Sequence, residues 1–319
     1  MMVVARLTVE SVASHTPDEV VVIDDIAGKL GLSRPKLKLF RRIHGFDRLR
    51  TSGDTGVLDL IAEPAARLVE AVDDPGRIRY LIYSHTIQEV APSHVDIASE
   101  LRAQLALRDA TAFALTQQNC ASGLAAIVTA GELLAADAEP GALALVVTGE
   151  KAFSPMAQLI PNTAISGDAS AACLISLSGD GDRVVACASR TDGRYSDGIR
   201  LSQELVQEFG AEYPARLAET ILAALAEAGL TLDDVALIVP HNVNRSSWRR
   251  VIEFLGISAD DVFLDNIAEY SHCFCSDQFL NYTHLRDQGR LIDGGYYVLT
   301  GVGLGATYTA MVLQRGGPA

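Results

Sequence analysis

Two periods of apolar positions alternate along most of the chain. Short runs of consecutive apolar residues, typical of strands covered on both faces, are separated by segments with helical spacing. Such an alternation predicts an α/β layered fold. The expected strands are 79–84, 112–115, 143–148, 171–177, 183–189, 235–239, 296–300 and 307–313, and the expected helices are 95–107, 124–136, 211–227 and 277–287.

Some of these segments carry more specific expectations. The run 143–148 is almost wholly apolar, which predicts a central strand. Strands 171–177 and 183–189 flank Ser178-Gly179-Asp180-Gly181-Asp182, and this turn predicts a hairpin. Gly229 is placed to end the helix before it.

The layout of the chain repeats once. In each half a helix leads to an apolar strand, the strand ends at a reactive residue (Cys120 or His241), and another helix follows. Residue identity between the halves is negligible, so the similarity is one of layout. We expect two α/β halves, 1–175 and 176–319, packed about a pseudo-twofold axis with the site between them.

Composition excludes several classes of protein. The chain has 319 residues, 49% apolar and 21% charged, with a net charge of −14. This acidity argues against nonspecific binding to nucleic acid or to anionic membranes. The sequence opens with no signal-peptide pattern, and no apolar run reaches ~18 residues. A soluble, cytoplasmic protein is expected.

The five cysteines form no pattern of disulfides, since their number is odd and their spacing irregular. Cys273-Phe274-Cys275 lacks the two-residue gap of a zinc or redox pair, so no metal is expected. Cys173 and Cys187 lie on strand-like runs and are expected in the core. His85 and His94, which flank a loop, are expected at the surface.

Cys120 stands at a strand-to-helix turn, in Gln117-Gln118-Asn119-Cys120-Ala121-Ser122-Gly123. Unpaired N–H groups at a helix N-terminus stabilise a thiolate, which makes such a cysteine a nucleophile. The alternative is a buried structural cysteine, since free Cys is among the most buried residue types.

Two histidines strengthen the first interpretation. His241 directly follows an apolar strand, where α/β sheets build their sites, and His272 precedes the helix 277–287. A cysteine with two histidines suits acyl transfer from a thioester: the thiolate attacks the carbonyl, and neutral imidazoles donate to the oxygen that becomes negative. The glycines of Gly301-Val302-Gly303-Leu304-Gly305 permit a turn that brings backbone N–H groups to the same place.

At this point the chain resembles the β-ketoacyl-ACP synthase III family of the thiolase fold, nearly end to end. The motifs that carry the resemblance are Cys120, Val239-Pro240-His241-Asn242-Val243-Asn244, Gly301-Val302-Gly303-Leu304-Gly305, Pro17-Asp18-Glu19-Val20-Val21, Gly31-Leu32 and Ser166-Gly167-Asp168-Ala169-Ser170-Ala171. The resemblance implies a layered α-β-α-β-α fold, a homodimer, and CoA or acyl carrier protein thioesters as substrates, with no permanently bound cofactor.

The resemblance also implies roles for single residues. Cys120 would take the acyl group, and His241 would be the family's motif histidine, with Asn244 as its supporting asparagine. The backbone N–H groups of Cys120 and of the Gly303-Leu304 turn would form the oxyanion hole.

Two departures from the family pattern stand out. At the position of His272 the family has asparagine, so the site here reads Cys–His–His, as in the elongating ketosynthases. The resemblance places an adenine-stacking tryptophan–arginine pair near 36–50, but the only tryptophan of the chain is Trp248, so the pair is incomplete there. This segment is instead basic, and Lys38, Arg41 and Arg42 form either a solvated helix face or a docking patch for CoA phosphates or an acidic carrier.

Three functions stay open. The first is decarboxylative condensation of the acyl group on Cys120 with a malonyl thioester, in a specialised fatty-acid or polyketide-type pathway. The second is acyl transfer to oxygen or nitrogen, with His272 deprotonating the acceptor. The third is an inactive assembly subunit of a heteromeric synthase, against which the intact Cys120 and His241 pair argues.

Overall fold

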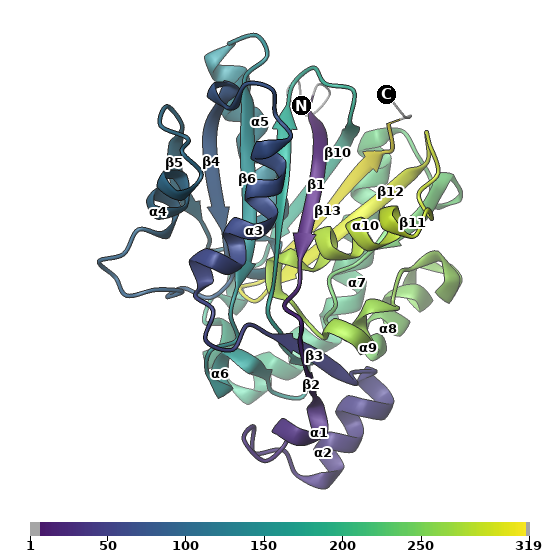
Figure 1. Ribbon diagram of the computed structural model, residues 1–319. Coiled ribbons are helices and arrows are strands. Elements are labelled where there is room, and N and C mark those ends of the chain that lie inside the picture. Colours follow the sequence, from purple (N-terminus) through teal and green to yellow (C-terminus); the bar gives the residue numbers. More distant parts are fainter. Residues whose placement is uncertain (1–6, 317–319) are drawn as a thin grey trace.

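A large mixed sheet forms the centre of the computed structural model, which describes residues 7–316 (Figure 1). Within these residues the sheet has nine strands, in the spatial order β11 (Val235–Val239), β12 (Tyr296–Gly303), β13 (Thr307–Gln314), β10 (Asp182–Thr191), β1 (Thr8–His15), β9 (Ala169–Ser176), β6 (Leu143–Glu150), β4 (Ile78–Ser84) and β5 (Thr111–Leu115). Each of the strands expected from the sequence is present.

The nine-stranded sheet consists of two parts, which are hydrogen-bonded to each other only at one end of β1 and β10. Strands β1 and β10 pair only at Thr8↔Arg183 and Val9↔Asp182. Strand β1 pairs with β9 along most of its length, and β10 pairs with β13 along most of its own. The prediction of a hairpin between 171–177 and 183–189 is therefore wrong, because β9 and β10 do not pair with each other. The N-terminal strand β1 lies between β9 and β10 and hydrogen-bonds to both, which no local turn pattern can reveal.

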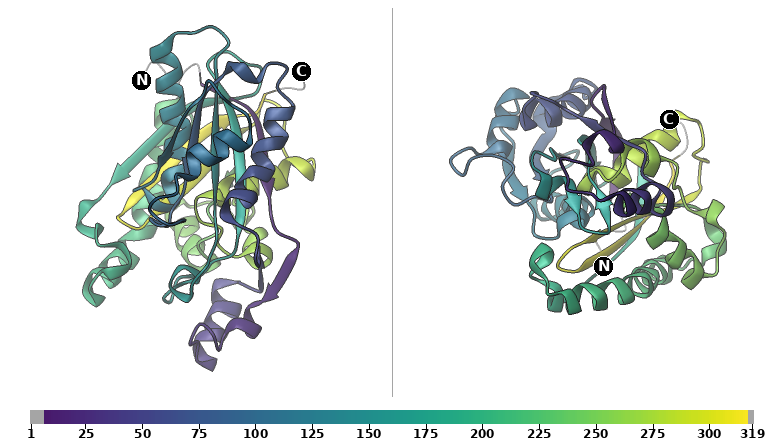
Figure 2. Two further views of the ribbon diagram at one scale, coloured as in Figure 1. Left: turned by 60° about the vertical axis from the view of Figure 1, so that its left-hand side comes forward. Right: turned by 90° about the horizontal axis from the view of Figure 1, so that it is seen from below.

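Helices cover both outer faces and fill the space between the two sheets (Figures 1 and 2). Figure 2 (right) shows the longest of them, α7, along one outer face. The helices of the layers are α3 (Val57–Glu70) and α4 (Ile97–Gln104) on one outside, α5 (Ser122–Asp137) and α10 (Asp277–Asp287) in the middle, and α7 (Gln203–Ala228) and α8 (Arg245–Leu255) on the other outside.

Alternating side chains of the central strands assign these layers. In β6, Ala144 and Val146 pack into the middle core with α5, whereas Leu145 and Val147 pack outward with α3 and α4. All eight residues of β6 are buried, which confirms the expected central strand. Burying one such Val or Leu stabilises the fold by roughly 1.5–3 kcal/mol. The arrangement is the α-β-α-β-α layering that the resemblance implies.

The helices that follow Cys120 and His241 lie in different layers. The helix after Cys120, α5, lies between the sheets, but the helix after His241, α8, lies on an outer face. The partner of α5 in the middle is α10, the helix after His272. One segment, Asn119–Asp137, is long and apolar enough for a membrane span, and 56% of its window is buried inside the protein. Its place between two sheets accounts for that composition.

Short elements complete the described chain, several of them below the sheet in Figure 1. They are β2 (Glu19–Val22), α1 (Ile23–Ile26), α2 (Arg34–Leu39) with a π-helical turn at Phe40–His44, β3 (Arg48–Thr51), α6 (Pro155–Gln158), β7 (Leu159–Ile160), β8 (Ala164–Ile165), α9 (Asn266–Tyr270) and 3-10 turns at Pro75–Arg77, Asn119–Ala121, Gly193–Tyr195, Gly198–Arg200, Leu232–Asp234, Ala259–Asp261 and Phe274–Ser276.

Candidate active site

Cys120 lies where the sequence predicts it, on a turn that leads into a helix. The 3-10 turn Asn119–Ala121 runs directly into α5. Asn119 has a φ of 49°, a left-handed conformation that asparagine tolerates better than most residues. The turn therefore places Cys120 just before the N-terminus of α5, and the residue is 5% exposed.

Gly123 allows α5 to approach the segment that carries His272. A Cβ atom at this position would lie 2.8 Å from the carbonyl oxygen of Cys275 and 2.8 Å from the ring of Phe279. Both distances are shorter than real Cβ contacts, so only glycine fits. The close approach brings a cysteine and a histidine that are 152 residues apart into contact.

His272 binds Cys120 through one ring nitrogen and Asp277 through the other. Its Nε2 lies 3.2 Å from the Cys120 Sγ, and its Nδ1 lies 2.5 Å from an Oδ2 oxygen of Asp277. The backbone is held on both sides, because His272 N donates to Ile165 O and its own carbonyl accepts from Gly167 N, each at 3.0 Å. A thiol, an imidazole and a carboxylate thus form one hydrogen-bonded chain.

Asp277 is itself fixed by the backbone. Asn242 N donates to its Oδ2 and Cys273 N to its Oδ1, each at 2.7 Å. These bonds hold both oxygens of the fully buried side chain in place. Asp277 is not among the site residues predicted from the sequence. Its only sequence signal is an acidic residue at a helix start, and that signal is common, since acidic residues favour the first helical turn.

The protonated form of His272 is stabilised by its partners. Burial disfavours the imidazolium, but the negative charges of Asp277 and Cys120 outweigh it and raise the pKa of His272 well above 6.5. The carboxylate fixes the proton on Nδ1 and leaves Nε2 directed at the sulfur. This arrangement can take a proton from the thiol and hold it.

His241 lies at the end of β11 in a different environment. Its Nε2 lies 3.1 Å from the Tyr213 hydroxyl, and its carbonyl accepts a bond from Trp248 Nε1 at 3.1 Å. Nδ1 is buried and has no hydrogen-bond partner among residues 7–316. Burial and the charge of His272 lower the pKa of His241 to about 3, so this imidazole is neutral. The two imidazole rings are 6.3 Å apart.

Asn244 is a buried residue that fixes the segment after His241. Its Oδ1 accepts from Ser247 N at 2.7 Å, so it caps α8, and its Nδ2 donates to Thr163 O at 2.9 Å. Caps of this kind stabilise by about 1 kcal/mol. The residue therefore fixes the turn that positions His241, in keeping with the supporting role that the resemblance implies.

The glycine-containing end of β12 packs against the Cys120 turn. A Cβ atom on Gly303 would lie 1.9 Å from Gln118 O, and one on Gly301 would lie 3.0 Å from Cys120 O. The Asn119 side-chain amide donates to Leu304 O. Strand β12 extends through Gly303, three residues beyond the predicted end, and the turn itself begins at Leu304. The oxyanion-hole role of the Gly303 and Leu304 N–H groups stays a prediction.

The three basic residues proposed for docking lie in two kinds of environment. Arg41 forms ion pairs with Asp24 and Asp47, so its charge is already paired within the protein. Lys38 and Arg42 are exposed. Their role in docking CoA or a carrier protein stays a prediction.

A buried carboxyl group that the sequence analysis passed over lies near the site. Glu150 accepts backbone bonds from Thr86 N at 2.8 Å and from Ile87 N at 2.6 Å. Burial raises its pKa to about 7, although these N–H bonds and the charge of His272 oppose the shift. The prediction that His85 lies at the surface is wrong. The residue is buried, its ring stacks on Tyr83, and its Nδ1 lies 2.7 Å from Ile87 O. His94 is exposed as expected.

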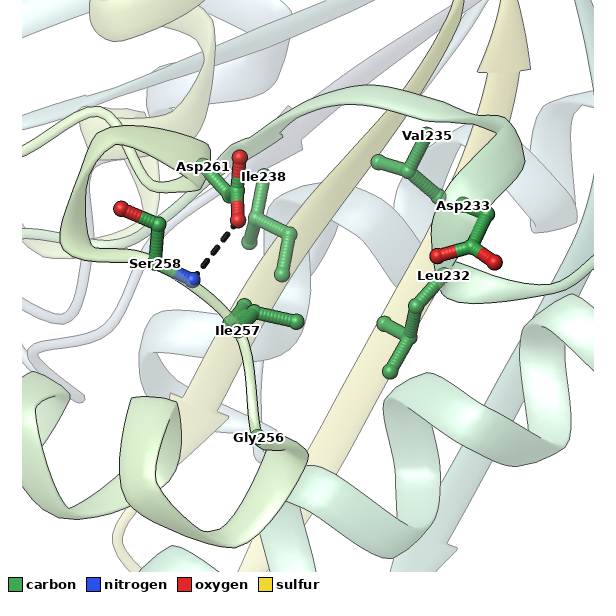
Figure 3. Close-up of a pocket in the computed structure, with 8 residues that line it drawn as sticks. All are labelled: Leu232, Asp233, Val235, Ile238, Gly256, Ile257, Ser258 and Asp261. Atoms are coloured by element: carbon green, nitrogen blue, oxygen red, sulfur yellow. Dashed lines mark hydrogen bonds between the residues drawn. The ribbon is translucent and has the colours of Figure 1, made fainter.

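A cavity of about 380 Å³ lies at the sheet edge beside β11, and none of its lining residues belongs to the site just described (Figure 3). Its lining residues are Leu232, Asp233, Val235, Ile238, Gly256, Ile257, Ser258 and Asp261. Asp261 accepts from Ser258 N at 2.8 Å, which closes a 3-10 turn at its rim.

Comparison with known proteins gives concordant matches. The family model for the C-terminal region of 3-oxoacyl-[acyl-carrier-protein (ACP)] synthase III matches residues 225–315. The β-ketoacyl-[acyl-carrier-protein] synthase III of Rhodobacter capsulatus is 26% identical over 335 residues, which span 97% of this chain and 99% of that protein.

Two solved structures superpose on the whole chain. ChlB3, named as an acyltransferase, gives a TM-score of 0.86 at 21% identity, over 98% of this chain and 99% of the other. The 3-oxoacyl-(acyl carrier protein) synthase III, FabH, of Pseudomonas aeruginosa PAO1 gives 0.81 at 22% identity, over the same shares. At these identities the likeness establishes the fold.

Proposed function

Since the chain is a β-ketoacyl-ACP synthase III-like enzyme of the thiolase fold, we propose that it carries an acyl group on Cys120 and passes it to an alcohol or amine. The observation that carries this proposal is the chain of contacts from Cys120 Sγ through His272 to Asp277, at 3.2 and 2.5 Å. An acyl transfer to oxygen or nitrogen must remove a proton from the acceptor. A carboxylate-bound imidazole is the group suited to accept it.

The first half of the reaction loads Cys120. His272 accepts the thiol proton at Nε2, the thiolate attacks the thioester carbonyl, and the leaving thiol takes the proton back. Asp277 stabilises the imidazolium between these steps. In the second half the acceptor gives its proton to His272, its oxygen or nitrogen bonds to the acyl carbon, and the carbon–sulfur bond breaks.

Decarboxylative condensation is the second candidate, and the neutral state of His241 favours it. Loss of CO₂ leaves an enolate, which needs neutral hydrogen-bond donors rather than a base. Of the two imidazoles, only that of His241 is a neutral donor. Asp277 makes the other one a better proton acceptor than the condensation requires. Acyl transfer without loss of CO₂ is therefore the better supported function.

The donor and the assembly belong to the same proposal. We expect CoA or acyl carrier protein thioesters as donors, because the relatives named above act in carrier-protein chemistry. A homodimer in the cytoplasm and a place in a specialised fatty-acid or polyketide-type pathway are further expectations. The exposed Lys38 and Arg42 are the candidate contacts for the donor's phosphates.

Intact-protein mass spectrometry tests the proposal. Wild type and Cys120→Ala are incubated with a panel of acyl-CoA and malonyl-CoA donors. An adduct that is absent from the variant establishes the acyl-enzyme and names the donor. A malonyl group that stays whole supports plain transfer, whereas its appearance as acetyl would make condensation the better function. No adduct with any donor would point to the assembly subunit.

A further inference from the structure

Tyr213, on α7, is a buried residue to which the proposed reaction assigns no step. It is 7% exposed, and its hydroxyl lies 3.1 Å from Nε2 of His241. Burial, Tyr308 and the nearby Cys120 thiol together raise the pKa of Tyr213 well above 10. The group that contacts His241 is therefore a neutral hydroxyl, close to the reactive sulfur.

The site is closed around this hydroxyl. Cys120 is 5% exposed, and His241 and His272 are each 1% exposed. A thioester and an acceptor cannot both reach the sulfur unless a side chain leaves. Of the contacts on the two imidazoles, the bond from His272 to Asp277 is charge-assisted, whereas the bond between His241 and Tyr213 joins neutral groups and is the weaker one.

The turn of α7 that carries Tyr213 also lacks one helical hydrogen bond. Pro214 has no N–H, so the carbonyl of Gly210 has no helical partner. Arg250 replaces it, with Nη1 donating to Gly210 O at 2.8 Å and Nη2 to Ala211 O at 3.3 Å. A side chain on this turn is displaced at lower cost than one in an unbroken helix.

A hydroxyl both donates and accepts a hydrogen bond, so Tyr213 presents to His241 the group that an alcohol acceptor would present. We propose that the Tyr213 hydroxyl occupies the acceptor's position, and that the acceptor is an alcohol which displaces it. This inference rests on the proposed acyl transfer from Cys120. It commits that transfer to oxygen and gives His241 the task of holding the acceptor.

The step balances without another reactant. The acceptor oxygen accepts a bond from His241 and gives its proton to Nε2 of His272. The new carbon–oxygen bond forms as the bond to Cys120 Sγ breaks, and the imidazolium remains paired with the thiolate. Until the acceptor arrives, Tyr213 keeps water from the same place and so protects the acyl-enzyme from hydrolysis.

The surroundings of Tyr213 indicate the body of the acceptor. The rings of Phe209 and Tyr308 lie 5.8 and 6.2 Å from that of Tyr213, and Tyr195 packs on Phe209 at 5.3 Å. The hydroxyls of Tyr195 and Tyr308 are buried, without a partner in the described part of the chain. An alcohol with a flat apolar face and further hydroxyl groups would fit this lining.

The first test needs no substrate. The alkylation rate of Cys120 by iodoacetamide is measured for wild type, Tyr213→Phe and Tyr213→Ala, with Tyr308→Phe as the matched control in the same aromatic cluster. Removing the covering hydroxyl should speed alkylation about tenfold, as for loss of one hydrogen bond, and removing the ring should speed it further. Equal rates in all four proteins would overturn the inference.

The second test supplies an alcohol to the space left by the deleted side chain. Tyr213→Ala is loaded from the donor found by mass spectrometry and given benzyl alcohol, whose ring replaces the deleted one and whose hydroxyl is an alcohol. A benzyl ester should form in this variant and not in Tyr308→Ala, and Tyr213→Phe should hydrolyse its acyl-enzyme about tenfold faster than wild type. Ester formation equal in both alanine variants would contradict the inference. Failure of every variant to load would instead reject the proposed acyl transfer, and alkylation would still decide whether Tyr213 covers the thiol.

Discussion

The rings of His241 and His272 are 6.3 Å apart and the two residues are equally buried, yet their surroundings shift the pKa of imidazole in opposite directions. On one side Asp277 and Cys120 raise the pKa of His272. On the other, a neutral tyrosine is the only side-chain partner recorded for the His241 ring in the described chain, and burial lowers its pKa to about 3. Burial alone therefore does not set the charge of an imidazole, because its partners decide it.

The largest expected difference between the two histidines is in the rate at which Cys120 is acylated when each imidazole is deleted. His272→Ala should slow acylation of Cys120 by roughly 10³-fold, because the thiol loses its proton acceptor. His241→Ala should slow the same step only about tenfold, since a neutral imidazole contributes hydrogen bonds. The rate of adduct formation measures both. Equal losses would show that the two imidazoles share one role.

Asp277→Asn tests the source of the difference. The amide removes the charge that holds the proton on His272, and we expect loading to fall about 10²-fold. The variant should also be less stable, by about 3–5 kcal/mol, as for breaking a buried pair.

The pH dependence of that stability loss has a definite sign. The folded pKa of His272 is raised, so the pair stabilises the fold fully below pH 6.5 and loses this effect as pH rises through the folded pKa. Urea unfolding should therefore separate wild type from Asp277→Asn more at pH 6 than at pH 9. A constant difference would contradict the assignment.

Glu150→Gln tests whether the buried carboxyl group near His272 has a raised pKa. The folded pKa of Glu150 is about 7 and its unfolded value 4.5, so its contribution is full below pH 4.5 and is lost as pH rises to 7. Wild type should lose about 3 kcal/mol of unfolding free energy over that range relative to the variant. Parallel unfolding curves across these pH values would show that Glu150 titrates normally.

Arg250→Ala is the mildest change and acts on the His241 side. Its loss leaves the Gly210 carbonyl without a partner, so we expect about 1 kcal/mol of destabilisation in thermal unfolding. Arg249→Ala is the matched control, because the neighbouring arginine is also exposed and has no recorded bond to α7. A larger effect of Arg249→Ala would remove the link to α7.

Segments with clear periodicity were predictable from the sequence, and long-range partners were not. Strand β11 and helix α10 have the bounds expected from their patterns. The insertion of β1 between β9 and β10, and the contacts of Asp277 and Tyr213, depend on packing between distant segments. Residue types marked Cys120 and His272 as reactive, but only the folded backbone brings a carboxylate to one histidine and a phenol to the other.

The joint between the two halves has a consequence for synthesis of the protein. Cys120 belongs to the first half of the chain, but its base lies 152 residues later and its carboxylate five residues beyond that. Domains fold as they leave the ribosome, N-terminal part first. A nascent chain thus contains the cysteine long before it contains His272 and Asp277. Under the proposed function, Cys120 therefore gains its proton acceptor only when translation is almost complete.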